Sequence, residues 1–178
     1  GTANVDSDYK DNLFQFLKLD ALRAYNNLTI HVSMERNLSK DYIEKNQTFI
    51  TRIADDIKQV AQSGKTYVVC YKKYENDLKE LIGDNDKIAI EHYGNTKGAN
   101  HLKDNHNIVC VGILHKGESY YLSKNLTLHG ESKYSVNTTG KLRRFDDENA
   151  EAIKVYEMVA ELAQEIFRTK LRNHSSSD

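Results

Sequence analysis

The chain has 178 residues and a formal net charge of −1, and 39 % of its residues are hydrophobic. That length suits one domain with a substantial core, and the apolar fraction excludes a disordered chain. The balanced charge argues against the broad basic surface of a protein that binds DNA on its own. The sequence has no apolar run long enough to span a membrane and no export signal, so we expect a cytoplasmic protein.

Hydrophobic periodicity predicts helices and strands in alternation. In chain order, the predicted elements are a helix at residues 8–26, a strand at 28–33, a helix from about 39–41 to 63, a strand at 66–71, a helix at 73–82, a strand at 87–92, a strand at 108–113, a helix at 119–129, a loop or weak hairpin at 130–144 and a long helix at 147–172. This order is typical of an α/β fold, here a three-layer sandwich around a mainly parallel sheet. Residues 1–26 would be an N-terminal helix or a linker from a preceding domain, and residues 27–178 the domain itself.

The apolar positions also predict which side chains are buried. Cys70 and Cys110 each lie in an apolar run and are expected as reduced thiols in strands of the core. Val60 is expected on the inner face of its helix, and Tyr156 and Val159 on the inner face of the last helix. The histidines and cysteines show no metal-ligand spacing, so no metal site is expected.

The polar turn after the strand at residues 87–92 is the first candidate site. Gly94 and Gly98 would let the backbone approach a ligand closely. Thr96, Lys97 and Asn100 offer hydroxyl, ammonium and amide groups that suit phosphate oxygens. The alternative is an ordinary strand-to-strand turn in which Gly and Asn adopt positive φ. The segment is not a P-loop, which needs a GKS or GKT ending.

The end of the last predicted helix is the second candidate site. Gln164, Arg168 and Arg172 follow one another at spacings of four, which would place all three on one helical face. A guanidinium group suits the charge that develops on a γ-phosphoryl group during its transfer. The alternative is a solvated helix end whose basic residues complement the helix dipole.

Three segments resemble motifs of superfamily 2 helicases and occur in the family's order. The run TYVVCYKKYENDLKELI, which begins at Thr66 and includes Lys72, resembles motif IV. The pattern Thr96-x-Gly98-x-Asn100, followed by a strand, resembles motif V.

The third segment, QEIFR at residues 164–168, resembles the start of motif VI, which usually reads QxxGRxxR. Phe167 stands where the family usually has glycine, and the final arginine is Arg172, one residue later than the pattern. The arginine finger is therefore either Arg168 or Arg172.

The resemblance covers roughly residues 66–172 and implies a shortened RecA-like lobe, the C-terminal lobe of a DEAD/DEAH-type helicase or translocase. ATP and Mg²⁺ would bind only in the intact protein, between this lobe and an N-terminal RecA-like lobe, and DNA or RNA would be the other partner. Within the motor, the resemblance assigns transition-state stabilisation to Arg168 or Arg172 and positioning of the γ-phosphate to Gln164. It assigns contacts with nucleic-acid phosphates to Thr96, Lys97, Asn100 and Lys72. The chain alone would not hydrolyse ATP.

Two other functions stay open. One is a non-catalytic α/β module for nucleotide binding or partner docking, in which the glycine turn and the arginines serve an interface. The other is a small phosphate-handling α/β enzyme of a different family. Enzymatic activity of the isolated chain would favour the last of these and contradict the motor lobe.

Overall fold

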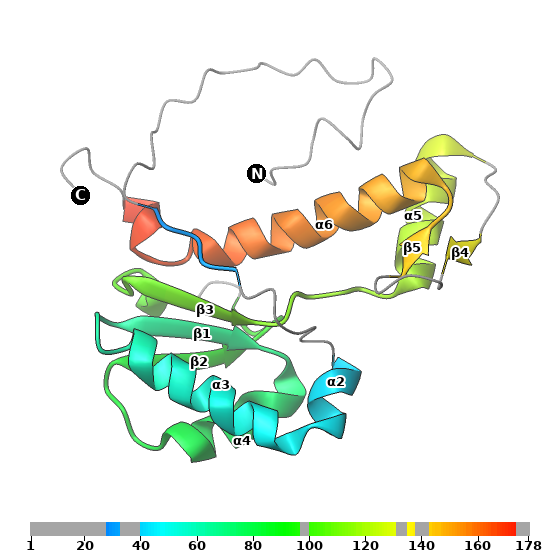
Figure 1. Cartoon of the computed structure of the whole chain (residues 1–178). Helices are drawn as coiled ribbons and strands as arrows, with labels where there is room; N and C mark the ends of the chain where they lie inside the picture. Colours follow the sequence, from blue (N-terminus) through cyan, green and yellow to red (C-terminus); the bar gives the residue numbers. More distant parts are fainter. Residues whose placement is uncertain (1–27, 33–39, 97–99, 131–134, 138–142, 174–178) are drawn as a thin grey trace. The chain divides into compact units, whose positions relative to one another are not determined.

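The computed structural model describes residues 28–32, 40–96, 100–130, 135–137 and 143–173 (Figure 1). The described residues fall into two compact units. The first, the sheet unit, holds residues 28–114 and 164–173, and the second, the helical unit, holds residues 115–163.

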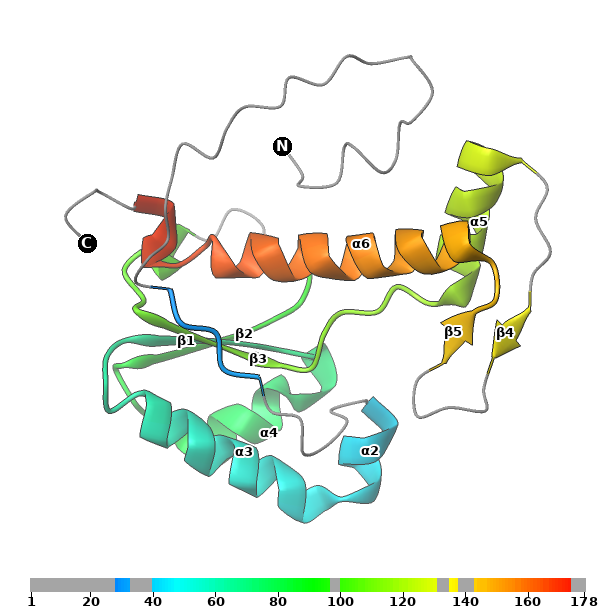
Figure 2. The ribbon, with the colours of Figure 1, turned by 45° about the horizontal axis from the view of Figure 1, so that its top comes forward.

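A three-stranded parallel sheet is the centre of the sheet unit (Figures 1 and 2). Its strands are β1 (Thr66–Cys70), β2 (Ile88–His92) and β3 (Asn107–Val111), in the order β2-β1-β3. Every residue of the middle strand β1 is buried, as its uninterrupted apolar sequence predicts. The α/β class and the parallel sheet are thus confirmed.

Helices α3 (Gln47–Val60) and α4 (Lys72–Ile82) cover one face of this sheet (Figure 1). Their inner residues pack with alternate residues of the strands in one apolar cluster: Ile53, Ala54, Ile57, Val68, Cys70, Leu78, Ile82, Ile90 and Val111. The prediction of a single helix before β1 is wrong, because Asn46 separates α2 (Lys40–Lys45) from α3 and donates its side-chain amide to the Tyr42 carbonyl at 2.9 Å. Val60, expected inside, is the last residue of α3 and is exposed.

The other face of the sheet carries Tyr67, Val69, Tyr93 and Leu102 in a second apolar cluster. Leu102 comes from the short helix η1 (Asn100–Leu102), which lies between β2 and β3 in sequence. The Tyr67 hydroxyl extends from this face to Glu165, near the end of α6 (Glu148–Ile166). The sheet unit therefore joins residues from both halves of the chain.

The last helix is shorter than predicted. α6 ends at Ile166, where the Thr169 hydroxyl donates to the Ile166 carbonyl at 2.7 Å and the backbone turns tightly. The Lys170 amide then donates to the Asn105 carbonyl at 3.0 Å, which holds the start of η2 (Lys170–Asn173) beside the segment before β3. These bonds replace the helical ones that a helix to residue 172 would need.

The predicted strand at residues 28–33 is wrong for its described part. Residues 28–32 are extended and exposed but pair with no strand among the described residues. Their alternating pattern fits a strand, but a strand forms only with a hydrogen-bonding neighbour. The predicted helix at residues 8–26 lies outside the described residues.

The helical unit contains α5 (Glu118–His129), β4 (Val136–Asn137), β5 (Arg144–Phe145) and most of α6. Strands β4 and β5 pair antiparallel, which confirms a weak hairpin at residues 130–144. The core of the helical unit consists of Tyr121, Phe145, Ala150 and Ile153.

Within the helical unit, the predicted start of α6 is correct, but part of its predicted inner face is wrong. The start is as expected, because the Asp147 carboxylate accepts from the Ala150 amide at 2.9 Å and caps the helix. Tyr156 and Val159 were expected on the inner face but are 44 % and 51 % exposed. The residues of this stretch that pack inward are Ala150, Ile153 and Ala160.

Candidate functional site

The turn after β2 presents its backbone at the carboxyl edge of the sheet. The Asn95 amide donates to the His92 carbonyl at 3.1 Å, and Gly94 between them has a φ of +95°. A type II turn requires such a positive φ at its third residue, which favours glycine. Gly94 and Asn95 are exposed, and among the described residues, the two chain neighbours of Gly94 apart, no atom lies within 4 Å of the place where a Gly94 side chain would begin. The described residues therefore leave this backbone uncovered.

Thr96 leaves the turn and enters the interior. Its side chain is only 1 % exposed, and its hydroxyl donates to Glu165 Oε1 at 2.8 Å. In this conformation the hydroxyl is therefore not presented to a ligand. The bond instead ties the turn to the end of α6, 69 residues later in the chain.

The Glu165 carboxylate is the centre of this arrangement. It is 3 % exposed, and its second oxygen, Oε2, accepts from the Tyr67 hydroxyl at 2.7 Å. Arg168 Nε lies 3.2 Å from the same oxygen. Burial, together with the hydrogen bond to Glu165, raises the pKa of Tyr67 well above its ordinary value. Burial and the charge of Glu165 raise the pKa of the Cys110 thiol to about 12.

Gln164, Arg168 and Arg172 do not share a helical face, contrary to the expectation from their spacing. Gln164 is exposed in the last turn of α6, whereas Arg168 follows the end of that helix and Arg172 belongs to η2. The Arg168 side chain is largely buried beside Glu165, and the Arg172 side chain lies outside the described part of the structure. The helix ends early because of the turn at Ile166.

The other predicted contact residues belong to separate segments of the chain. Lys72 is exposed and begins α4, two residues after β1 ends. Asn100 is exposed in η1. Lys97 and Gly98 lie outside the described residues.

A cluster of three ionisable side chains beside the turn was not expected from the sequence. His92, the last residue of β2, has its Nδ1 atom 2.6 Å from Glu75 Oε2, and Lys79 Nζ is 2.6 Å from Glu75 Oε1. Burial opposes ionisation of Glu75, but the hydrogen bonds from Lys79 and His92 outweigh it and lower the pKa of Glu75. The spacing of Glu75 and Lys79 was a usable signal, since residues four apart meet on a helix. Glu75 and His92 are 17 positions apart, and that spacing offered no such signal.

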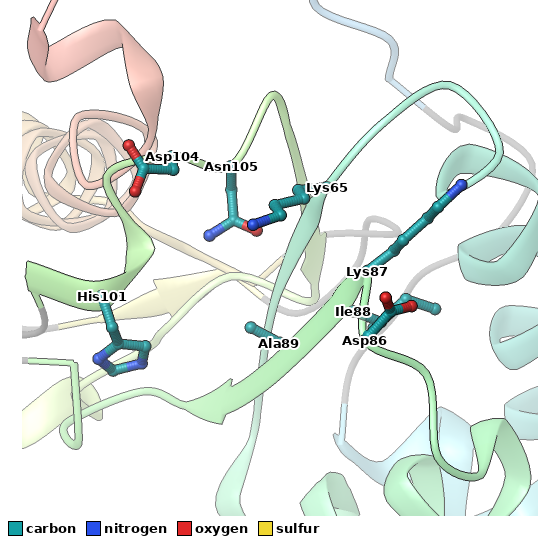
Figure 3. Close-up of a pocket in the computed structure, with 8 residues that line it drawn as sticks. All are labelled: Lys65, Asp86, Lys87, Ile88, Ala89, His101, Asp104 and Asn105. Carbon is teal, nitrogen blue, oxygen red and sulfur yellow. The ribbon is translucent and has the colours of Figure 1, made fainter.

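A small pocket lies at the opposite, amino edge of the sheet (Figure 3). Its volume is about 150 Å³, and its lining includes residues from just before each strand: Lys65, Asp86, Lys87, His101, Asp104 and Asn105. Two lysines and two aspartates balance one another there. These four side chains thus give the lining no excess of either charge.

No group of three His, Cys, Asp or Glu side chains that could hold a metal ion is found in the described part of the chain. Within the same residues, no helix combines the length and apolar character needed to cross a membrane. The chain matches no protein-family model, no curated protein and no solved structure.

Proposed function

We propose that the sheet unit is a RecA-like lobe, the C-terminal motor lobe of an ATP-dependent helicase or translocase of superfamily 2. The observation that carries the proposal is the bond between Thr96 and Glu165. It joins the segment that resembles motif V to the segment that resembles motif VI, although the two are far apart in sequence. A parallel sheet with helices α3 and α4 on one face is compatible with such a lobe.

In the proposed motor, ATP and Mg²⁺ lie between this lobe and an N-terminal RecA-like lobe that supplies the phosphate-binding loop. Arg168 or Arg172 places a positive charge near the γ-phosphate, and Gln164 helps to position that group. Gln164 is exposed, which suits a group that meets a ligand held by another lobe, whereas the Arg168 side chain is largely buried. Lys72, Lys97 and Asn100 contact the phosphates of DNA or RNA.

Substitution of the arginines tests the ATPase role. In a protein that contains both lobes, Arg168→Ala should reduce ATP turnover by roughly a thousandfold and leave ATP affinity nearly unchanged, because a finger acts on the transition state. The isolated chain should release no phosphate from ATP. Unchanged turnover in both Arg168→Ala and Arg172→Ala, or turnover by the isolated chain, would refute the proposal.

Substitution of one exposed lysine at each edge of the sheet tests the nucleic-acid role. The isolated chain should bind a single-stranded oligonucleotide more weakly as salt rises, and Lys72→Ala should reduce the slope of log K against log salt by about one phosphate contact. Lys87→Ala is the matched control, since it removes an exposed lysine from the opposite edge. Equal reductions of this slope in both variants would mean that the oligonucleotide does not bind specifically at the carboxyl edge.

A non-catalytic regulatory module is the second candidate. It is favoured by the inward direction of the Thr96 hydroxyl and by the ion pair between Arg168 and Glu165, which occupy both groups within the unit. Such a module would neither bind the oligonucleotide nor change ATP turnover when Arg168 or Arg172 is replaced.

A further inference from the structure

One side of α6 carries an apolar seam that faces away from the core of the helical unit. The seam consists of Ala152, Val155, Val159 and Leu162, at spacings of three, four and three. Val155 and Val159 are 46 % and 51 % exposed. Val159 comes nine residues after the buried Ala150, so at about 100° per residue it lies half a turn around the helix from that core position. A helix that met only water on this side would carry polar residues there.

The seam has the pattern of a coiled-coil interface. Apolar residues at alternating spacings of three and four form the a and d positions of a heptad repeat, and such positions pack against a second helix. Tyr156 and Met158 flank the seam and widen its apolar side. The pattern therefore predicts a partner helix with matching spacings.

Residues 8–26 supply a helix of this kind. The sequence predicts an amphipathic helix there, and its apolar positions include Phe14, Leu17, Ala21 and Ala24. These four residues have the same spacings of three, four and three as the seam of α6. The predicted helix has 19 residues, which is also the length of α6. The two helices can therefore pack along their whole length.

The course of the chain sets the direction of the second helix. Residues 28–32 and the last turn of α6 belong to the sheet unit and lie side by side (Figures 1 and 2). A helix that ends at residue 26 therefore ends near the C-terminal end of α6, and its earlier residues run along α6 in parallel. If Phe14 is level with Ala152, then residue 28 is level with Ile166, the last residue of α6.

In this register the facing side chains complement one another. The layers pair Phe14 with Ala152, Leu17 with Val155, Ala21 with Val159 and Ala24 with Leu162. The first and last layers each combine a large residue with a small one, which allows close packing. On the flank, Lys18 falls beside Glu151, which has the opposite charge.

We propose that the seam of α6 is the docking site for residues 8–26, which lie along it as a parallel helix with Leu17 opposite Val155. Docking removes the exposed side chains of Val155 and Val159 from water, together with the apolar side of the second helix. The inference goes beyond the proposed function and does not depend on it, because neither ATP nor nucleic acid takes part.

The first test introduces two cysteines into the 178-residue chain. In Leu17→Cys/Val155→Cys, oxidised glutathione should close a disulfide within one chain, because a heptad layer brings the Cα atoms into the range of about 4–7 Å that the bond needs. Gln15→Cys/Val155→Cys is the matched control, since residue 15 lies on the opposite side of the same predicted helix. The disulfide should form at least about tenfold faster in the first variant, because docking raises the effective concentration of the two thiols.

The second test measures amide hydrogen exchange by NMR and needs no cysteine. The amides of residues 13–24 should exchange at least about tenfold more slowly than in an unfolded chain. Val159→Asp should abolish this protection, because docking would bury the new charge. Val60→Asp is the matched control, since it replaces an exposed valine of the sheet unit and should leave the protection unchanged. In both variants the Ile153 amide reports whether the helical unit stays folded.

Three results would overturn the inference. One is an equal rate of disulfide formation in the two double variants. Another is exchange of residues 13–24 at unfolded rates in the native chain, or protection that persists in Val159→Asp. The third is a disulfide between two chains, with a dimer in sedimentation, which would show that a second copy occupies the seam. If a cysteine variant does not fold, the exchange experiment alone decides. The motor proposal stands or falls separately, since its tests measure ATP turnover and oligonucleotide binding.

Discussion

Replacement of Gly112 by alanine should destabilise the sheet unit far more than the same change at another glycine. Gly112 follows β3 directly and has a φ of +84°. A Cβ atom there would lie 2.5 Å from Cε2 of the Tyr71 ring, and the Tyr71 hydroxyl is fixed by a hydrogen bond to the Ile113 carbonyl at 2.7 Å. The ring therefore cannot move aside without loss of that bond.

The expected cost has two parts. An L-residue in the left-handed region costs about 1–2 kcal/mol. Displacement of a packed ring by an added carbon costs about 1–3 kcal/mol more. Gly112→Ala should therefore lower the free energy of unfolding of this unit by roughly 2–5 kcal/mol, which is a large part of the stability of a small domain.

Native-state hydrogen exchange at the Val68 and Val69 amides of β1 measures this free energy. Gly83→Ala isolates the backbone strain, because Gly83 has a φ of +71° and, apart from its chain neighbours, no described residue lies within 4 Å of its Cβ position. Tyr71→Leu in the Gly112→Ala background should recover part of the loss by removing the ring. The reasoning fails if Gly112→Ala costs no more than Gly83→Ala, or if leucine at position 71 restores nothing.

Two further predictions concern buried ionisable groups. Burial raises the pKa of Cys70, like that of Cys110, to about 12. Neither thiol should therefore react with a disulfide reagent at mildly alkaline pH until the chain is unfolded. Rapid reaction of the folded chain would contradict this prediction. The pKa of Tyr67 is raised by burial and by Glu165, so the stability that its protonated hydroxyl contributes is present below the unfolded value of about 10 and is lost as the pH rises above it. Urea unfolding across the alkaline range should therefore show a shallower decline of stability in Tyr67→Phe than in the native chain, and equal declines would refute the assignment.

Elements with a strong local pattern were predicted well. The continuous apolar run of β1 and the helical spacing of α4 each place the element within a residue or two of its observed bounds. Both patterns are local. A strand buried on two faces has consecutive apolar residues, and a helix buried on one side has apolar residues at spacings of three and four. The α/β class follows from their alternation.

The failures arise where distant contacts decide the structure. Residues 28–32 read as a strand, but sequence alone does not supply a neighbouring strand. The end of α6 at Ile166 depends on the hydrogen bond from the Lys170 amide to the Asn105 carbonyl, and no pattern in the neighbouring residues predicts that bond. Glu165 could not be identified as a buried carboxylate, because its partners Tyr67 and Thr96 lie 98 and 69 residues away.

The separation of Glu165 from its partners also constrains the order of folding on the ribosome. The strands and helices α3 and α4 are synthesised well before residue 165 leaves the exit tunnel. Until then the Tyr67 and Thr96 hydroxyls lack the acceptor that they have in the finished structure. Both hydroxyls must therefore bond to water or to another acceptor during synthesis, and they reach Glu165 only when the last turn of α6 arrives.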